Sequence, residues 1–598
     1  MIDFEKSRQE ALDFVSLTVL TKKLTSTDIH RLSKIKKTDL KLSQYIEVWS
    51  VSIEICRDDV FQEINFYVGF PLEFPLVLPK VYLQYIEREK LKYIPHVDSD
   101  GLVCLYDDED VIVNWKHPGQ IVKECLIKAQ KILEDGLSKA NILDFEEEFT
   151  AYWDQKYSRH DEVRSELFMI ENISLPEAGF LCLTTIHPNY QGYNIIIHNE
   201  SNEFTNFKKY LNDAKYRLTE GRALFFGLLD STLPFDETFA SAYNSIKQNF
   251  PKLVGEFQRY VTKNDGPIVA IFARQIKSQY IFFGWQIGPL ALKKSGFRTI
   301  SLNAWNVFSV LDSHKSVLRL KFDTFTSTRL SRRTDGPSPL DMGKCIAMVG
   351  LGSIGSNLLP YLLSLQLKKL DLIDPDILAV ENINRHLLGM NFIKRHKVNA
   401  LEEYLKSGNP LLDVKGHVTS VIHLIKQEPS ILTHADLVVV CVGKTNIEEF
   451  IVSSLSKLNA TNAVAILWVE PYLIGAHCVY LRPQRKLNFG KLFENGIFKF
   501  NVVDPSEYSN SEKSLLFKEG GCQTSYLPYG QYGITRFLST LIPELFDLLT
   551  DPVEKDLVFT FKGSDSVLNQ SGLRLSIFGA QMSSNSIRKS ILDEDINW

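Results

Sequence analysis

The alternation of apolar and polar residues predicts different structures at the two ends of the 598-residue chain. Near the N-terminus, residues 45–55 and 61–68 alternate apolar with polar side chains, as strands of an antiparallel sheet do. Residues 114–133 place apolar side chains about 3.6 residues apart, which predicts an amphipathic helix. In the C-terminal half, apolar runs at 345–349 and 370–373 lie on either side of a helical pattern, which predicts a βαβ unit.

The middle of the chain has a less specific pattern. A helical segment at 237–247 precedes strand-like runs at 267–273 and 280–287, so we expect a mixed α/β or α+β domain. We find no catalytic constellation of residues in it. Its expected task is to hold the two ends apart or to dock the substrate.

Length and turn-forming residues indicate several domains. A chain of 598 residues exceeds the size at which one hydrophobic core stops growing, and residues 334–339 form a turn-rich boundary. We therefore expect a multidomain protein of the α/β and α+β classes. Its predicted parts are an N-terminal α+β domain at 1–150, a middle linker domain at 151–325 and a nucleotide-binding α/β domain at 326–598.

Composition and charge argue against some partners and compartments. The net charge is −5 and no long basic block carries interleaved aromatic residues, so we expect no direct binding to nucleic acid. The charged start lacks the apolar core of a signal peptide, and no uncharged apolar run approaches the roughly 18 residues that span a membrane. We therefore expect a cytoplasmic protein without a membrane partner. Its eight cysteines show no Cys-x-x-Cys spacing, which argues against zinc and against a disulfide framework.

Glycine spacing in the predicted βαβ unit indicates a nucleotide site. Gly350, Gly352 and Gly355 follow the first apolar run, and Asp374 ends the second run 19 residues past Gly355. Glycines allow a tight turn and a close backbone approach, the N-terminus of the next helix faces phosphate, and the acid takes ribose hydroxyls. On its own, this fingerprint fits any dinucleotide-binding dehydrogenase.

Four polar residues change that interpretation. Asn384 and Arg385 lie about ten residues beyond Asp374, Lys397 follows on the next predicted helix, and Arg332 lies in a basic segment before the first strand. Hydride transfer does not need three cations and an amide at the phosphates, whereas the activation of ATP for attack does. The nucleotide is therefore predicted to be consumed.

These motifs, in this order, resemble the ubiquitin-activating and ThiF/MoeB-type adenylating family over residues 326–535. The resemblance implies a Rossmann-like adenylation domain that uses ATP and Mg²⁺. It also implies that phosphate and ribose are bound at the matching positions, which are Gly350, Gly352, Gly355, Asp374, Asn384, Arg385 and Lys397. In this family an arginine that matches Arg332 often reaches into the site of the partner subunit, which implies a homodimer through this domain.

One position departs from the family. The strand that begins near residue 437 ends in Gly443, where the family usually has an Asp that binds magnesium. Either Asp374 or Asp376 holds the metal, or the metal contacts mostly phosphates. An inactive pseudoenzyme is the third alternative, which the intact phosphate-binding residues disfavour.

The N-terminal motifs resemble the ubiquitin-conjugating, or carrier, enzyme fold over roughly residues 1–145. They are, in order, Phe70-Pro71, Pro79-Lys80-Val81, Gly101-Leu102-Val103-Cys104-Leu105, Trp115 and Pro118. The resemblance implies that Cys104 carries a thioester. The other interpretation is a small buried hydrophobe, which is the commonest role of a free cysteine. Because Cys104 follows Gly101 in a predicted loop, we favour the thioester.

Two features near Cys104 leave alternatives open. The carrier family usually has His-Pro-Asn shortly before its cysteine, and here Ile94-Pro95-His96 stands in that place. Either His96 replaces the asparagine in stabilising the oxyanion or no residue does. The acids Asp107–Asp110 form a solvated face, or one of them orients and deprotonates an incoming lysine amine.

A second candidate cysteine follows a long polar stretch. Residues 482–516 are polar and irregular, which is typical of a functional loop or of disorder. Cys522 follows two glycines after this stretch, where activating enzymes keep their thioester cysteine on a mobile crossover loop. The other interpretation is an exposed thiol without a function. By contrast, Cys441 and Cys478 lie in apolar strand patterns and are expected in the core.

Together, the two cysteine-bearing modules resemble the fused activating and carrier enzymes of bacterial CBASS antiphage operons. That family conjugates the C-terminus of a cGAS-like nucleotidyltransferase to amines, as if it were ubiquitin. The resemblance implies a role in antiviral defence, with target-protein lysines as acceptors and an acyl group that passes from an adenylate to Cys522 and then to Cys104. The alternatives are a ubiquitin-like or sulfur-carrier modifier as substrate, and a catalytically silent scaffold that binds nucleotide as a switch.

Overall fold

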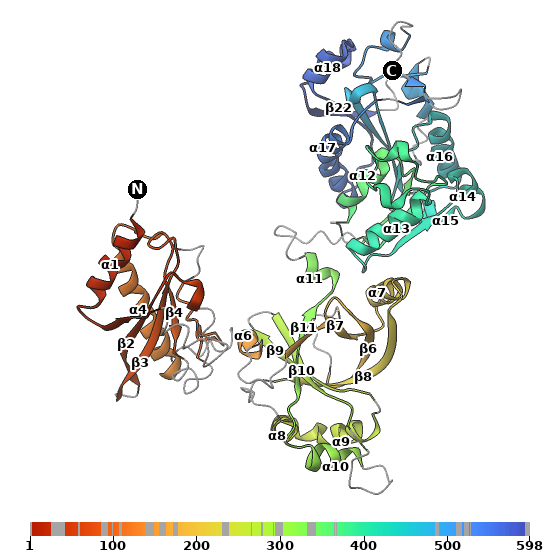
Figure 1. Cartoon of the computed structure of the whole chain (residues 1–598). Helices are drawn as coiled ribbons and strands as arrows, with labels where there is room; N and C mark the ends of the chain where they lie inside the picture. The colour runs from red at the N-terminus through yellow and green to blue at the C-terminus, as the bar shows by residue number, and fades with distance from the viewer. Residues whose placement is uncertain are drawn as a thin grey trace. The chain divides into compact units, whose positions relative to one another are not determined.

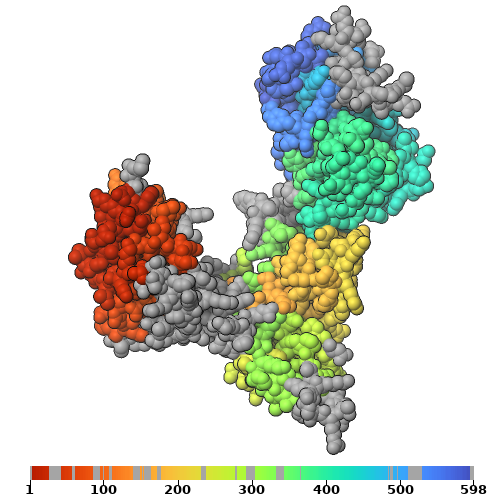
Figure 2. Space-filling view, in the orientation of Figure 1, coloured from red at the N-terminus to blue at the C-terminus, as the bar shows by residue number. Residues whose placement is uncertain are grey.

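The computed structural model describes most of the chain, which is drawn in colour in Figure 1 and Figure 2. The described residues are 3–25, 42–57, 60–84, 94–98, 100–106, 111–138, 140, 149–154, 163–170, 177–229, 238–264, 266–276, 279–290, 292, 303–331, 343–363, 365, 367–482, 484, 489–494, 496–509, 517–518, 525–526 and 528–592. The chain divides into two compact units, Met1–Phe168 with Asn172–Ile197 and Leu218–Asp323, and Met169–Glu171 with His198–Arg217 and Thr324–Trp598. The boundaries of the three expected domains stay a prediction.

The N-terminal part of the first unit is a four-stranded antiparallel sheet with two helices packed against it (Figure 1). The strands follow chain order: β1 (Leu20–Lys23), β2 (Glu47–Arg57), β3 (Val60–Phe70) and β4 (Lys80–Leu83). Helix α1 (Phe4–Val15) precedes them and α4 (Pro118–Ser138) follows them. This part is α+β, as expected, although α4 begins at Pro118 and not at Asn114. Proline suits the first turn of a helix because its missing N–H would have no partner there.

One hydrophobic core joins this sheet to its helices. Trp49, Phe66 and Phe70 point into it from β2 and β3, as alternation along a strand requires, and all three are fully buried. The same cluster contains Val103 and Leu105, which flank Cys104. The core of this domain therefore holds the loop that carries the candidate cysteine.

The rest of the first unit is built on a closed seven-stranded barrel. Around the barrel the strands follow the order β10 (Gln279–Ile287), β11 (Leu318–Thr324), β5 (Val163–Met169), β7 (Tyr193–His198), β6 (Gly179–Tyr190), β8 (Arg217–Leu228) and β9 (Ile268–Ile276). One cluster rich in aromatic residues packs the barrel against α6 (Phe149–Asp154), α8 (Phe239–Asn249) and α9 (Val254–Lys263). Helix α7 (Asn202–Asp213) lies between β7 and β8 in sequence and belongs to the second unit. The predicted helix and strands are present as α8, β9 and β10, but closure of the barrel was not predicted because local periodicity does not specify which distant strands pair.

The C-terminal domain is organised by an eight-stranded sheet (Figure 1). Its parallel strands, in spatial order, are β14 (Val414–His417), β13 (Lys369–Ile373), β12 (Cys345–Val349), β15 (Leu437–Val440) and β16 (Ala463–Val469). Antiparallel pairing continues the sheet with β17 (Gly475–Leu481), β22 (Asp556–Lys562) and β23 (Ser586–Leu592). The chain leaves β12 through α12 and returns to β13, so the predicted βαβ unit is confirmed.

Helices cover both faces of this sheet. One hydrophobic cluster joins the sheet to α12 (Ser353–Leu362), α13 (Lys397–Gly408) and α17 (Gln531–Thr550). The other cluster joins it to α14 (Val421–Gln427) and α16 (Thr445–Lys457). Consecutive residues of β12 divide between the clusters, with Met348 in one and Val349 in the other. A strand buried on both faces is a continuous apolar run, which is what the sequence showed, and the arrangement is the expected Rossmann-like fold.

The polar stretch at 482–516 differs from expectation wherever it is described. It contains the 3-10 helices Phe489–Leu492 and Pro505–Ser509, and Phe498 and Phe500 are buried in the core. The buried carboxylate of Glu470 accepts the N–H groups of residues 502 and 503 at 2.7 and 2.8 Å. The expectation of a structureless loop was therefore wrong for these residues, because spaced aromatic side chains and a distant acid hold them. Among the helices that the structure describes, none has the length and apolar character to cross a membrane.

Candidate active site

The phosphate loop lies between β12 and α12, at the carboxyl end of the parallel strands. Gly350 adopts φ +85°, and a Cβ added to it would lie 2.7 Å from the carbonyl oxygen of Cys441. A Cβ on Gly355 would overlap the carbonyl oxygen of Gly350. The first glycine is therefore required for the turn and the second for the close approach of helix and loop. Gly352 begins α12 as its N-cap, and open space surrounds its missing side chain.

Asp374 fixes this loop from the end of β13. Its Oδ2 accepts the N–H of Leu351 and its Oδ1 accepts the N–H of Asp376, both at 2.7 Å. Asp374 as a whole is only 5 % exposed. Asp374 thus sits where a ribose-binding acid is expected, and the loop conformation depends on it as well.

Lys397 is the first residue of α13 and is buried beside the two acids. Its Nζ lies 2.9 Å from Oδ2 of Asp376 and 4.0 Å from Oδ1 of Asp374. The side chain of Asp376 is 65 % exposed, whereas that of Lys397 is 9 % exposed. The buried ammonium of Lys397 is therefore paired with Asp376, an acid that is already exposed to solvent.

The segment that carries Asn384 and Arg385 is attached to the phosphate loop by His386, which sequence reasoning had not singled out. His386 Nδ1 accepts the N–H of Leu388 at 3.0 Å, so its Nε2 is the protonated nitrogen that donates to the carbonyl of Leu351 at 3.0 Å. Burial lowers the pKa of His386 to about 4, so the ring is neutral near pH 7. In the sequence, only the position of His386 directly after Asn384 and Arg385 could have indicated its role.

Tyr529 and Gln531 are two further residues that sequence reasoning missed. The hydroxyls of Tyr529 and Ser353 share a hydrogen bond of 2.7 Å at the N-terminus of α12. The guanidinium of Arg385 lies over the Tyr529 ring, 6.0 Å from its centroid. Gln531 donates to Oδ1 of Asn357 at 3.0 Å, and Asn357 donates to the carbonyl of Arg385 at 2.9 Å. These contacts connect Arg385 with the phosphate loop.

The position of the expected metal-binding acid is filled by Gly443, which has φ +66°. No described atom lies within 4 Å of a Cβ built there, so packing does not exclude a side chain. Glu448 is a buried acid close by and accepts the N–H of Lys444 at 3.2 Å. Burial raises the pKa of Glu448 to about 7. Among the described residues, no group of three or more His, Cys, Asp or Glu side chains could hold a metal ion.

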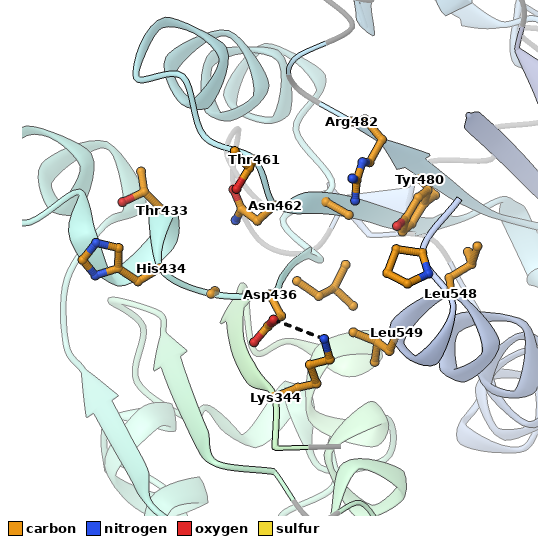
Figure 3. Close-up of a pocket in the computed structure, with 14 residues that line it drawn as sticks. Lys344, Thr433, His434, Asp436, Thr461, Asn462, Tyr480, Arg482, Leu548 and Leu549 are labelled. Carbon is orange, nitrogen blue, oxygen red and sulfur yellow. Dashed lines mark hydrogen bonds and ion pairs between the residues drawn. The ribbon is translucent and has the colours of Figure 1, made fainter. Parts of the chain in front are cut away.

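A cavity of about 270 Å³ lies at the other end of the same sheet (Figure 3). Lys344 and Asp436 are neighbours in its lining and form an ion pair at 3.5 Å, and Asp436 also accepts the N–H of Cys345 at 2.8 Å. These residues lie at the amino ends of β12 and β15, whereas ligands of open α/β sheets bind at the carboxyl ends. The cavity is therefore not part of the nucleotide site.

Cys104 lies on a short hairpin that pairs with β4. Asp98 donates its N–H to the carbonyl oxygen of Leu102 at 2.8 Å, and Cys104 donates its N–H to the carbonyl oxygen of His96 at 2.7 Å. Gly101, which closes the turn, has φ +88°, and a Cβ there would lie 2.6 Å from the carbonyl of Leu83. The hairpin therefore needs a glycine three residues before the cysteine.

The hairpin presents the thiol to solvent. Val103 and Leu105 are buried, whereas Cys104 between them is exposed, so the alternation of a strand turns the sulfur outward. This placement does not fit a buried structural cysteine. His96 is half-buried, with φ +63°, and its backbone pairs with Cys104. The structure thus brings together the two residues that the sequence separates by eight positions.

A groove of about 300 Å³ lies beside the residues that follow Cys104. Its lining includes Tyr106, Ile112, His117 and Glu124, of which Ile112 is fully exposed. The groove is therefore lined in part by polar groups, those of Tyr106, His117 and Glu124 among them, which the sequence had not indicated. The acids at 107–110 lie outside the described residues, as do Cys522 and Arg332, so their expected roles stay predictions.

Two family profiles match separate parts of the chain. Residues 27–160 match the prokaryotic E2 family B, and residues 343–461 match the ThiF family. The chain fuses an E2-like domain to an E1-like ThiF domain. Cys104 belongs to the E2-like domain, and the loop at 350–355 with Lys397 belongs to the ThiF domain.

Solved structures that match parts of the chain share little sequence with it. A PaaA structure is 15 % identical over 40 % of this chain and 73 % of its own, with a TM-score of 0.31. The tRNA N6-threonylcarbamoyladenosine dehydratase TcdA of E. coli, in complex with ATP, is 20 % identical over 22 % of this chain and 55 % of its own, with a TM-score of 0.20. MccB of E. coli is 13 % identical over 40 % of this chain and 64 % of its own, with a TM-score of 0.26. The chain thus spans less than two thirds of TcdA and MccB, and similarity at this level assigns no function. No curated protein matches the chain.

Proposed function

We propose that the chain is an ATP-dependent activating and conjugating enzyme that joins a protein C-terminus to amines. The observation that carries the proposal is the combination, in one chain, of an exposed thiol on an E2-like domain with a ThiF domain. In the ThiF domain, Lys397, Arg385 and the N-terminus of α12 belong to one network of contacts around the phosphate loop. Cations and N–H groups gathered in this way suit charge that develops on phosphate.

The first step is adenylation of the carboxylate. A carboxylate oxygen attacks the α-phosphorus of ATP, the bond to the β-phosphate oxygen breaks, and pyrophosphate leaves. Gly350, Gly352 and Gly355 let the backbone approach the phosphates, and Lys397, Arg385 and Asn384 stabilise the charge on them. Asp374 binds the ribose hydroxyls. Lys397 acts by exchanging its contact with Asp376 for a phosphate oxygen, which the exposure of Asp376 permits.

Magnesium fits this site through oxygen ligands. Mg²⁺ is usually bound by one or two carboxylates together with substrate phosphates and water, so a cluster of three protein ligands is not required. Asp376 is the residue that would hold it, because its side chain is 65 % exposed, whereas that of Asp374 is 6 % exposed. The ion would neutralise part of the phosphate charge.

The acyl group then passes between two thiols. The Cys522 thiolate attacks the acyl carbon and AMP leaves. The Cys104 thiolate attacks the new thioester and releases Cys522, and an amine finally attacks the Cys104 thioester and loses a proton as the thiolate leaves. His96, next to Cys104, is the candidate to stabilise the oxyanion of these last steps.

The substrate is the C-terminus of a cGAS-like nucleotidyltransferase, and the acceptors are lysines of target proteins, in a CBASS antiviral system of the cytoplasm. The ThiF domain acts as a homodimer in which Arg332 completes the partner's site. This part of the proposal rests on the resemblance of the two cysteine-bearing modules in their order along the chain. A ubiquitin-like or sulfur-carrier modifier is the alternative substrate, and a silent nucleotide-binding scaffold is the alternative of another class.

Exchange of pyrophosphate into ATP tests the proposal. The chain should exchange labelled pyrophosphate when given a peptide with the C-terminal sequence of a cGAS-like nucleotidyltransferase. The same peptide with a C-terminal amide is the matched control and should give no exchange, because it has no carboxylate. Exchange with a ubiquitin-like modifier but not with the peptide would identify the modifier as the substrate. Exchange with neither would favour the alternative that the chain is a catalytically silent, nucleotide-binding scaffold.

A further inference from the structure

Two side chains at the start of α17 attach that helix to the nucleotide site. The Tyr529 and Ser353 hydroxyls lie 2.7 Å apart, and Gln531 donates to Oδ1 of Asn357 at 3.0 Å. Ser353 and Asn357 belong to the first two turns of α12. The N-terminus of such a helix is where phosphate binds, because its N–H groups have no partner within the helix. The contact is therefore made at the functional end of α12.

Arg385 is held by the same contacts. Its guanidinium lies 6.0 Å from the centroid of the Tyr529 ring, within the range in which the ring face attracts a cation. Its backbone carbonyl accepts from Nδ2 of Asn357 at 2.9 Å, and Asn357 donates to the carbonyl of Ser353 as well. The backbone and the side chain of Arg385 are thus both oriented relative to α12.

We propose that Tyr529 is a positioning residue for the phosphates of ATP. Its hydroxyl sets the side chain of Ser353 at the helix N-terminus, and its ring sets the direction of Arg385. Tyr529 acts through these two residues and does not take part in bond making. It lies seven residues after Cys522 in sequence. The inference rests on the proposed function, because it assigns Tyr529 to the activation of ATP.

Substitution of Tyr529 should weaken the binding of ATP in two stages. Tyr529→Phe keeps the ring below Arg385 and loses the hydroxyl, so the affinity for ATP should fall about threefold to tenfold, as for one lost hydrogen bond. Tyr529→Ala loses both contacts, and the affinity should fall about tenfold to fiftyfold. Binding of adenosine should change less than twofold in both variants, since adenosine has no phosphate.

Calorimetric titration of the full chain with ATP and with adenosine measures both quantities. Tyr532→Phe is the matched control, because Tyr532 is an exposed tyrosine in the first turn of α17, three residues after Tyr529, and it should bind like the unsubstituted chain. Ser353→Ala and the double variant with Tyr529→Phe complete a cycle. If the hydroxyl acts through Ser353, the two losses should not add. The double variant should then bind ATP as tightly as whichever single variant binds ATP less tightly.

Three results would overturn the inference: Tyr529→Phe binding ATP as tightly as Tyr532→Phe does, a loss shared equally by ATP and adenosine, or losses that multiply in the double variant. If Tyr529→Ala fails to fold, Tyr529→Phe and the cycle still decide. These titrations need no acyl substrate. A chain that binds ATP in this pattern but exchanges no pyrophosphate would contradict the proposed function alone, whereas exchange without the pattern would contradict the inference alone.

Discussion

Lys397 and Asp376 form an ion pair in which Nζ lies 2.9 Å from Oδ2, with the lysine buried and the acid mostly exposed. A buried ammonium is costly unless it is paired. Because water already solvates Asp376, the acid loses little when its partner turns to a phosphate group. The pair therefore keeps a positive charge ready at the phosphate loop.

The first prediction concerns this lysine. Lys397→Ala should lower the rate of pyrophosphate exchange by roughly a hundredfold or more, because a preorganised charge is lost from the transition state. Lys415→Ala removes an exposed lysine from β14 and should leave the rate unchanged. Rates are compared at saturating ATP and substrate. Equal exchange rates for Lys397→Ala and Lys415→Ala would show that Lys397 does not stabilise the transition state of adenylation.

The second prediction separates adenylation from the thiols. The variant with Cys104→Ala and Cys522→Ala should still exchange pyrophosphate, within about threefold of the unsubstituted chain, because the carboxylate attacks ATP without a cysteine. The same exchange assay measures it. Loss of exchange in the double variant would mean that one of the thiols is needed for the structure.

The third prediction concerns the order of the two thioesters. The compact unit that contains the phosphate loop covers positions 324–598, a range that includes position 522, whereas Cys104 belongs to the other unit. Cys104→Ala should accumulate a substrate adduct on Cys522 that thiol reductant removes, and should give no amide product. Cys522→Ala should leave both positions unloaded. Cys104→Ser should trap an oxyester that resists reductant, because an alkoxide is a poorer leaving group than a thiolate.

Electrophoresis of each variant with ATP and substrate, with and without reductant, shows these adducts. Cys478→Ala is a cysteine control, because Cys478 is buried in the core of the ThiF domain and burial raises the pKa of its thiol. It should load and transfer as the unsubstituted chain does if it folds. An adduct on Cys104 that forms normally in Cys522→Ala would exclude the relay and indicate an enzyme with one catalytic cysteine.

The fourth prediction concerns pH and His386. Burial lowers the pKa of His386 to about 4, so between about pH 4 and 6.5 the unfolded ThiF domain binds more protons than the folded one. Stability therefore rises with pH across this window and is lost as the pH falls. The contribution of His386 alone should make the free energy of unfolding about 2 kcal/mol lower at pH 5 than at pH 7.5.

Calorimetric melting of the full chain at the two pH values measures the effect on the ThiF transition. His386→Gln keeps a donor for the carbonyl of Leu351 and cannot gain the proton, so its melting should depend less on pH. His434→Gln changes an exposed histidine outside the site and serves as the control. A pH dependence in His386→Gln that equals that of the control would show that His386 does not titrate as stated.

The fifth prediction tests the proposed action of Arg332 across a dimer. Arg332→Ala and Lys397→Ala should each be inactive as homodimers. When the two variants are produced together, about a quarter of the exchange activity should return, because half of the dimers are mixed and each mixed dimer has one complete site. Tagged chains purified in sequence isolate the mixed dimer. Activity that stays absent in the mixed dimer would place Arg332 in the site of its own subunit.

Local requirements along the chain were enough to predict the elements of both sites. Gly350 has a positive φ and no room for a Cβ, so this position of the loop requires a glycine. Asp374 follows a strand that is buried on both faces and accepts the N–H of Leu351, so an acid is expected at the end of the second strand of the same βαβ unit. Gly101 meets similar limits three residues before Cys104. Such limits depend on backbone conformation and on neighbours in sequence. For that reason the glycine loop, a loop around Cys104 and the α/β and α+β classes were predictable, whereas the pairing of the Cys104 loop as a hairpin was not.

Contacts between distant segments were decided by the tertiary structure alone. Tyr529 meets Ser353 across 176 residues, and Glu470 holds a stretch that had been expected to be structureless. The neutral state of His386 depends on its burial, and its ring donates to the carbonyl of Leu351, which lies 35 residues earlier in the chain. The closed barrel also places β11 beside β5, although the two strands are far apart in sequence. Periodicity along a chain records which face of an element is buried, but it does not record which side chain lies opposite, because that depends on how the elements pack.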